Sequence, residues 1–146
     1  MAGAPPSPPS VLHRMRLRIY YEDTDFSGAV YHASYLRFLE RGRTEWLREL
    51  GFDQRTAFEA TTRIAFVVRR LSIDYLRPAR MDDVVSIETG LREARGASLV
   101  LAQGVRREEE RLVEAQVTVA ALAAGRPVRL PARIREALAA AQAAGP

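Results

Sequence analysis

One run of residues, 35–50, constrains the fold of this 146-residue chain more than any other. Residues at spacings of three and four share one face of a helix there: Tyr35, Phe38, Leu39, Gly42, Trp46 and Leu50. Gly51 comes just after the last apolar residue, as is typical of a helix C-terminus. Gly42 lowers helix propensity within the apolar stripe, so we expect another backbone to approach the helix closely there. The pattern predicts one long amphipathic helix that lies against a sheet.

The other apolar residues alternate with a period of two, which is the pattern of half-buried strands. Five such runs occupy 15–22, 64–77, 85–91, 99–105 and 113–121. The second run changes phase near Arg69 and Arg70, which indicates a bulge. Short turns join the last three runs and predict an antiparallel meander. One strand, one long helix and four strands predict an α+β domain, a five-stranded antiparallel sheet with the helix on one face.

We expect this domain to occupy residues 15–125. Residues 1–14 begin with a proline-rich segment and are predicted to be a disordered tail. Residues 126–146 are predicted to hold a short, alanine-rich helix over 131–140, with little to bury, and a tail. No run approaches the ~20 apolar residues of a transmembrane helix, and no basic segment precedes an apolar one as in a signal peptide. With no cysteine in the sequence, these features predict a cytoplasmic protein.

The positive charge of the chain comes entirely from arginine. All 22 basic residues are arginine, and the formal net charge is +4. They are spread along the chain beside acidic residues, so binding to nucleic acid is not favoured. Arginine suits a phosphate-bearing small molecule, but coding bias explains its exclusive use equally well.

A polar window at 20–35 holds the candidate catalytic residues. It joins the end of the first predicted strand to the start of the long helix, whose free N–H groups and positive dipole favour developing negative charge. A carboxylate such as Asp25 beside this helix start would complete a site for acyl transfer. Gly28 would let the intervening loop turn sharply. From the residues alone, Asp25 is equally compatible with a turn or a cap, and His32 with a core or capping role.

The motif in this window resembles that of the 4-hydroxybenzoyl-CoA thioesterase family. The matching residues are 21–25, Gly28, 30–32 and Tyr35. Weaker support comes from 38–45 and 74–83, and the resemblance covers about Leu17 to Ala123. Within the family, the chain is most similar to the YbgC-type branch associated with the Tol–Pal system.

The resemblance implies a hot-dog fold, in which the sheet wraps around the long helix. It also implies a homodimer, often paired into a tetramer, with its active site at the subunit interface. The implied reaction converts an acyl-CoA with a short-chain or aromatic acyl group to a free acid and CoA, without a cofactor. Asp25 would be the general base or nucleophile, and the backbone N–H of His32 would hold the oxyanion. The side chains of Tyr21 and His32 would orient groups, with Glu40 as a reserve catalytic residue, and peripheral association with Tol–Pal is a further expectation.

Four arginines are candidates to bind the phosphates of CoA, although solvated strand-end charges are an equally good interpretation of each: Arg69, Arg70, Arg77 and Arg80. No metal site is expected, since the sequence has two histidines, no cysteine and no ligand spacing. Two alternatives remain. One is a non-catalytic protein that binds acyl-CoA. The other is a hot-dog hydratase or dehydratase, although its usual histidine and glycine-proline-rich stretch are not found.

Overall fold

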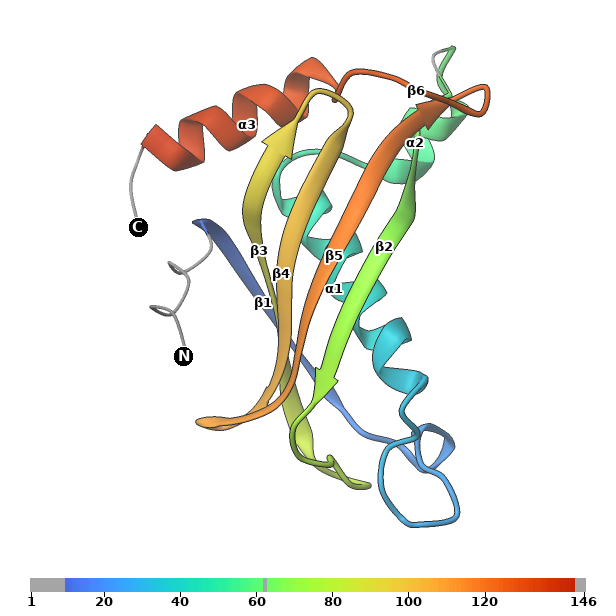
Figure 1. The fold of residues 1–146 in the computed structure, drawn as a ribbon, viewed down its shortest axis with the longest axis vertical. Helices are drawn as coiled ribbons and strands as arrows, with labels where there is room; N and C mark the ends of the chain where they lie inside the picture. Colours follow the sequence, from blue (N-terminus) through green and yellow to red (C-terminus); the bar gives the residue numbers. More distant parts are fainter. Residues whose placement is uncertain (1–9, 62, 144–146) are drawn as a thin grey trace, which may run out of the picture.

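The computed structural model describes residues 10–61 and 63–143 and contains one curled antiparallel sheet. Its strands are β1 (Ser10–Arg18), β2 (Ala65–Tyr75), β3 (Val84–Arg95), β4 (Ser98–Arg107), β5 (Glu110–Ala123) and β6 (Arg126–Pro127). The five long strands lie in the order β1-β3-β4-β5-β2, and the two-residue β6 pairs with β5 (Figure 1). The predicted five-stranded antiparallel sheet is therefore confirmed, with β6 as a small addition.

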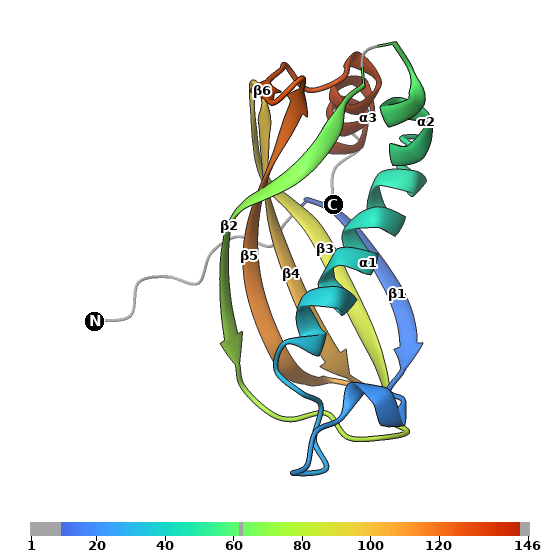
Figure 2. The same cartoon turned by 90° about the vertical axis from the view of Figure 1, so that its right-hand side faces the viewer.

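Helix α1 (Ser34–Glu49) lies in the hollow of the curled sheet (Figure 2). Its buried side carries the predicted stripe, from Tyr35 to Trp46. The helix ends as the sequence predicts: Gly51 has a φ of 87°, its N–H donates to the carbonyl of Arg48, and the Phe52 N–H donates to that of Leu47. These two bonds satisfy carbonyls that the helix end would otherwise leave free.

Gly42 fits α1 closely against the sheet. A Cβ at this position would lie 2.8 Å from Cγ2 of Ile87 and 2.9 Å from Oγ1 of Thr89. The predicted close approach thus exists, but sheet side chains make it, and the expectation of a second backbone was wrong. Beside it, the buried Gln103 amide donates to the Leu39 carbonyl at 2.9 Å and to Thr89 Oγ1 at 2.8 Å.

Two apolar clusters lie along the sheet on either side of this amide. The distal core surrounds Trp46 and consists of Trp46, Leu47, Phe52, Leu91, Leu99, Leu101, Val117, Val119, Ala121, Leu130, Ile134 and Leu138. The proximal core surrounds Tyr35 and consists of Ile19, Val30, Tyr35, Phe38, Leu39, Ala79, Val85, Ile87, Val105, Leu112 and Val113. Burial of large apolar side chains in both clusters supplies the main driving force for folding.

The edge strands differ in detail from the sequence prediction. The predicted bulge in β2 is confirmed by a register shift between Val68 and Arg70. Strand β1 begins at Ser10, five residues before the predicted start, and ends at Arg18; Tyr21–Asp23 forms the 3-10 turn η1. The alternation does not continue as strand because the Asp23 carboxylate accepts the Tyr20 N–H at 2.8 Å and folds the backbone back.

The C-terminal segment packs more tightly than predicted. Helix α3 (Ala132–Ala143) buries Ile134 and Leu138 completely or nearly so in the distal core. Leu130, Ile134 and Leu138 are four residues apart and form an apolar stripe, so the expectation of little to bury was wrong. The short helix α2 (Gln54–Glu59) completes this end of the molecule.

The predicted tails fall partly outside the described residues. Of the expected N-terminal tail, residues 1–9 lie outside them and residues 10–14 belong to β1; residues 144–146 also lie outside. Within the described ranges, no helix is long and apolar enough to cross a lipid bilayer.

Candidate active site

The loop between β1 and α1 folds into a tight turn at Asp25–Gly28. The Gly28 N–H donates to the Asp25 carbonyl at 3.0 Å, and Gly28 has a φ of 85°, which glycine tolerates best. The Asp25 N–H donates to the Ala29 carbonyl at 2.9 Å, and Thr24 pairs with Val30. The turn therefore presents Asp25 on a defined backbone at one end of the molecule.

Two donors from one residue bind the Asp25 carboxylate. The hydroxyl of Ser27 donates to Asp25 Oδ1 at 2.5 Å, and the Ser27 backbone N–H donates to the same oxygen at 2.8 Å. The hydroxyl contact lowers the pKa of Asp25 most, followed by the N–H contact, with a smaller contribution from the charge of His32. Asp25 is consequently ionised throughout the neutral range.

The start of α1 offers hydrogen-bond donors. No side chain caps the helix at Ala33, and no acceptor among the described residues takes the His32 backbone N–H. The Tyr75 hydroxyl, from the end of β2, donates to the His32 carbonyl at 3.0 Å. The His32 ring also meets that of Tyr31 edge-on, with centroids 4.6 Å apart. His32 is thus held on its carbonyl side, while its N–H donates to no acceptor among the described residues.

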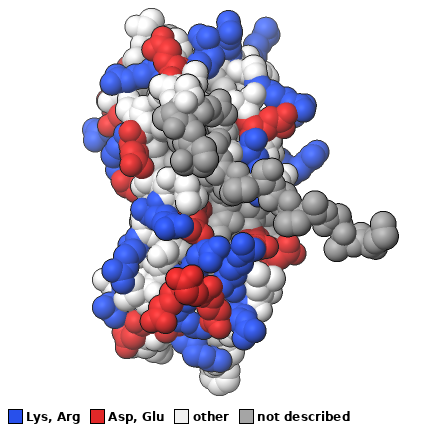
Figure 3. Space-filling view, turned by 90° about the vertical axis from the view of Figure 1, so that its left-hand side faces the viewer, with Lys and Arg blue, Asp and Glu red and all other residues white. Residues whose placement is uncertain are grey.

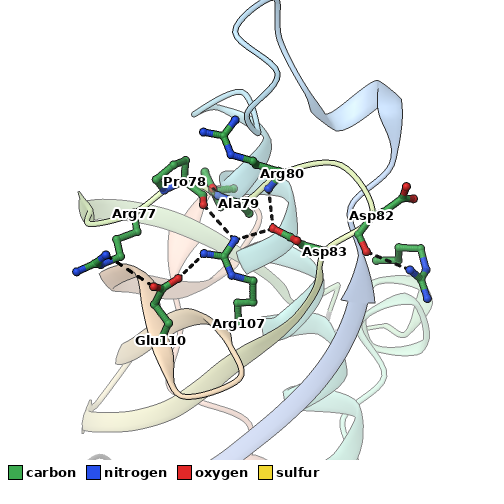
Figure 4. Close-up of polar contacts among 10 residues, drawn as sticks. Arg77, Pro78, Ala79, Arg80, Asp82, Asp83, Arg107 and Glu110 are labelled. Atoms are coloured by element: carbon green, nitrogen blue, oxygen red, sulfur yellow. Dashed lines mark hydrogen bonds and ion pairs between the residues drawn. The ribbon is translucent and has the colours of Figure 1, made fainter.

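The connection between β2 and β3, residues 76–83, supports this loop from behind. The Val30 N–H donates to the Ala79 carbonyl at 2.8 Å, and the Ala79 N–H donates to the Tyr35 hydroxyl at 3.0 Å. Arg107 of β4 reaches the connection from the other side and donates to Asp83 at 2.7 Å (Figure 4). The loop and α1 are thereby joined to the centre of the sheet.

Arg107 is enclosed by acceptors rather than open to a ligand. Besides Asp83, it contacts the Pro78 carbonyl at 3.3 Å and the Glu110 carboxylate. Partial burial raises the pKa of Asp83. The hydrogen bond from the Arg80 backbone N–H and the hydrogen bond and charge of the Arg107 guanidinium lower it by more, so the pKa of Asp83 lies below its usual value. Arg107 therefore has a structural role: it joins the β2–β3 connection to strands β4 and β5.

Two other predicted catalytic residues are not joined to Asp25 by any contact. The Tyr21 side chain is 79% exposed on η1, and its hydroxyl has no hydrogen-bond partner among the described residues. Glu40 lies two turns along α1, in the wall of a cleft of about 130 Å³ between α1 and the strands. That cleft also borders Arg43 and Phe66 but no residue of the β1–α1 loop.

The four candidate arginines form two separate groups. Arg77 and Arg80 belong to the connection behind the loop, and Arg77 is 3.8 Å from Glu110. The Arg80 guanidinium lies over the turn, 4.0 Å from where a Cβ of Gly28 would be. Arg69 and Arg70 lie at the β2 bulge, and Arg70 is about 23 Å of extended chain from Arg77 at ~3.3 Å per residue. The four arginines thus lie at two places along the chain, and Arg80 is the member beside the Asp25–Gly28 turn.

Exposed apolar side chains surround this end of the molecule. Those on the loop, the start of α1, the end of β2 and the β2–β3 connection are Tyr20, Tyr21, Phe26, Tyr31, Leu36, Tyr75, Leu76 and Met81. Arginine and carboxylate side chains are intermixed on the face drawn in Figure 3, and the arginines do not form one basic area there.

Sequence reasoning assigned no role to three residues of this arrangement. Ser27 lies inside the recognised window but was not considered a partner of Asp25, although a serine two residues after an aspartate is a common turn signal. Tyr75 is 43 residues from its partner His32, and Arg107 is 24 residues from its partner Asp83. Only the folded sheet brings these pairs together. In the described ranges, no three His, Asp or Glu side chains are grouped as a metal site requires.

Residues 27–114 match the model of the thioesterase superfamily. The chain belongs to this superfamily. Acyl-CoA thioesterase YbgC of Haemophilus influenzae is 45% identical over 123 residues, covering 83% of this chain and 90% of the relative. Acyl-CoA thioester hydrolase YbgC of Escherichia coli O157:H7 is 47% identical over 111 residues, covering 75% and 81%. The resemblance to the YbgC-type branch is confirmed.

Solved structures agree with this assignment. A probable thioesterase from Bartonella henselae is 41% identical, with a TM-score of 0.79 over 82% of this chain and 99% of its own. A thioesterase from Thermus thermophilus, complexed with coenzyme A and zinc, is 27% identical, with a TM-score of 0.78 over 92% and 96%. The predicted hot-dog fold is confirmed.

Proposed function

We propose that this member of the thioesterase superfamily hydrolyses an acyl-CoA to a free acid and CoA, with Asp25 as the catalytic carboxylate. The observation that supports this role is that one loop holds both an ionised, oriented Asp25 and the backbone N–H of His32, which no described residue accepts. The N–H would stabilise the oxyanion formed at the thioester carbonyl. Asp25 would activate water or attack the carbonyl itself.

Asp25→Asn tests this assignment directly. A general base typically contributes ~10²–10⁴-fold, so kcat should fall at least about 100-fold while the melting temperature is unchanged. Asp23→Asn is the matched control, because Asp23 accepts the Tyr20 N–H and asparagine retains a carbonyl oxygen for that bond. CoA release is followed by thiol titration. An unchanged rate for Asp25→Asn would exclude Asp25 as the catalytic group, and Glu40→Gln would then test the reserve residue.

The alternative functions are separated by the products. A hydratase would add water to crotonyl-CoA without releasing a thiol, whereas a non-catalytic binding protein would be stabilised by CoA esters without turnover. The curated relatives named above as thioester hydrolases favour hydrolysis. A panel of acyl-CoAs of graded length, with benzoyl-type members, would test the proposed short-chain or aromatic specificity.

Arg80 is the proposed contact for a phosphate of CoA, with Arg77 as a second candidate. Its guanidinium lies over the Asp25–Gly28 turn, and the arginine fork suits phosphate oxygens. Arg80→Ala should raise KM about 3- to 10-fold with little change in kcat, because removing a contact made equally in ground and transition states changes binding alone. Arg55→Ala, on the exposed surface of α2, is the control and should leave KM unchanged, whereas Arg69 and Arg70 at the β2 bulge are further proposed contacts.

A homodimer, assembled further into a tetramer, is the proposed active form. Strand β2 is eleven residues long, pairs with β5 on one side, and carries the exposed Val67 and Val68. An edge strand of this length has unpaired backbone groups on which another chain can pair, and Val67 and Val68 add exposed apolar surface there. Light scattering after gel filtration would give the oligomeric state. The cytoplasmic location and peripheral association with Tol–Pal remain predictions, testable by fractionation and co-purification.

A further inference from the structure

We propose that Ser27 is a positioning residue that holds Asp25 in its reactive state. The inference rests on the proposed function, because it assigns how the catalytic carboxylate is oriented. The Ser27 hydroxyl and backbone N–H both donate to Oδ1 of Asp25, at 2.5 and 2.8 Å. Neither bond reaches Oδ2.

The two oxygens of Asp25 therefore have different roles. Oδ1 is occupied by two donors, so rotation of the carboxyl group about its Cβ–Cγ bond would break both contacts. Oδ2 is left to accept a proton from water or to attack the thioester. Ser27 is itself oriented, since its hydroxyl oxygen lies 3.4 Å from the Ala29 N–H, which donates to it.

The backbone N–H contact alone is an ordinary aspartate turn, which any residue at position 27 could make. The hydroxyl is the additional element, and it is the largest cause of the lowered pKa of Asp25. The charge of His32, at the start of α1, acts in the same direction. Arg80, from the β2–β3 connection, lies over the same turn. Ser27 thus contributes both orientation and ionisation.

Replacement of Ser27 separates these contributions. Ser27→Ala removes the hydroxyl bond and keeps the N–H bond, so the pKa of Asp25 rises towards its ordinary value. The active form is the carboxylate, so activity is lost as the pH falls through this pKa, and the acid limb of kcat/KM should move to higher pH. At neutral pH, kcat should fall about tenfold. This is a part of the ~10²–10⁴-fold rate increase that a well-placed general base supplies, because Asp25 is still present but less well oriented. Ser27→Thr retains a hydroxyl and should restore both properties.

The measurements are kcat and kcat/KM across pH on the full chain, together with a 13C-carboxyl NMR titration of Asp25, assigned with Asp25→Asn. Ser98→Ala is the control, since the Ser98 hydroxyl bonds only weakly, at 3.4 Å, to the Arg95 carbonyl of a distant hairpin. A higher Asp25 pKa in Ser27→Ala, with Thr rescue, supports the proposal. An unchanged acid limb and an unchanged NMR pKa would overturn it. If Asp25→Asn is as active as the wild type, the proposed function fails instead, whereas the NMR titration still decides whether Ser27 sets the ionisation of Asp25.

Discussion

The two ends of the curled sheet are built from different kinds of contact. The distal core is closed by aromatic and aliphatic side chains from α1, α3 and the strands, with Trp46, Phe52 and Ile134 nearly or fully buried. At the proximal end, backbone and side-chain hydrogen bonds join the β1–α1 loop, the β2–β3 connection and Arg107, while aromatic rings face solvent. Both ends contain a buried core, but the proximal end also carries the hydrogen-bonded loop of the candidate site, so substitutions at the two ends should affect stability and activity differently.

Trp46 should give the largest effect on stability. Trp46→Ala removes the largest fully buried side chain of the distal core and should lower the free energy of unfolding by about 3–5 kcal/mol. Well below the melting temperature, kcat should remain close to wild type, because Trp46 packs in the distal core whereas the Asp25–Gly28 turn lies at the proximal end. Chemical denaturation and steady-state kinetics are the measurements. A collapse of kcat in the still-folded variant would show that the two ends are not separable.

Gly42 tests the boundary between the two cores. In Gly42→Ala, the new methyl group would meet Ile87 and Thr89 at 2.8 and 2.9 Å, which costs about 1–3 kcal/mol of overpacking. The higher helix propensity of alanine offsets at most about 1 kcal/mol, so the net change should be a destabilisation of about 1–2 kcal/mol. Arg41→Ala, on the exposed side of α1, is the control and should change stability by less than about 0.5 kcal/mol. Equal melting temperatures for both variants would contradict the close packing.

Tyr75 probes whether the proximal end positions the proposed oxyanion donor. Tyr75→Phe removes the bond to the His32 carbonyl and keeps the ring beside Tyr35. We expect kcat to fall about 3- to 10-fold, equivalent to roughly 1 kcal/mol, with an unchanged melting temperature. Tyr20→Phe, an exposed tyrosine nearby, should have wild-type kinetics. Identical rates for the two variants would mean that the hydroxyl does not orient the peptide.

Asp83 gives the smallest expected effect, and it depends on pH. Because the folded state lowers its pKa, Asp83 stabilises the fold above the unfolded pKa of about 3.9, and this contribution is lost as the pH falls through the folded pKa. Asp83→Asn should therefore be less stable than wild type at pH 7, by about 1 kcal/mol or less for a partly exposed pair. The difference in melting temperature should shrink towards pH 3. A constant difference across this range would show that charge is not the cause.

The local features of the fold could be read from the sequence, whereas the long-range ones could not. Alternation predicted the five long strands and the β2 bulge, and the helical stripe with Gly51 predicted α1 and its end. The start of β1 and the burial of α3 were missed, because pairing with β3 and contact with the distal core decide them. For the site, the motif located Asp25 and His32 in one loop. The contacts from Tyr75 and Arg107 depend on sheet register, which alternation alone does not give.

The bond from Gln103 to the Leu39 carbonyl fixes α1 at one point along the sheet. Inserting or deleting one residue between His32 and Leu39 would turn the start of the helix by about 100° and shift it by about 1.5 Å relative to that point. The amide of residue 32 would then face a different direction. The spacing between the anchor and the helix start is therefore a length constraint on evolution and design: exposed positions of this segment, such as Arg37, should tolerate substitutions, but the segment should not tolerate changes in residue number.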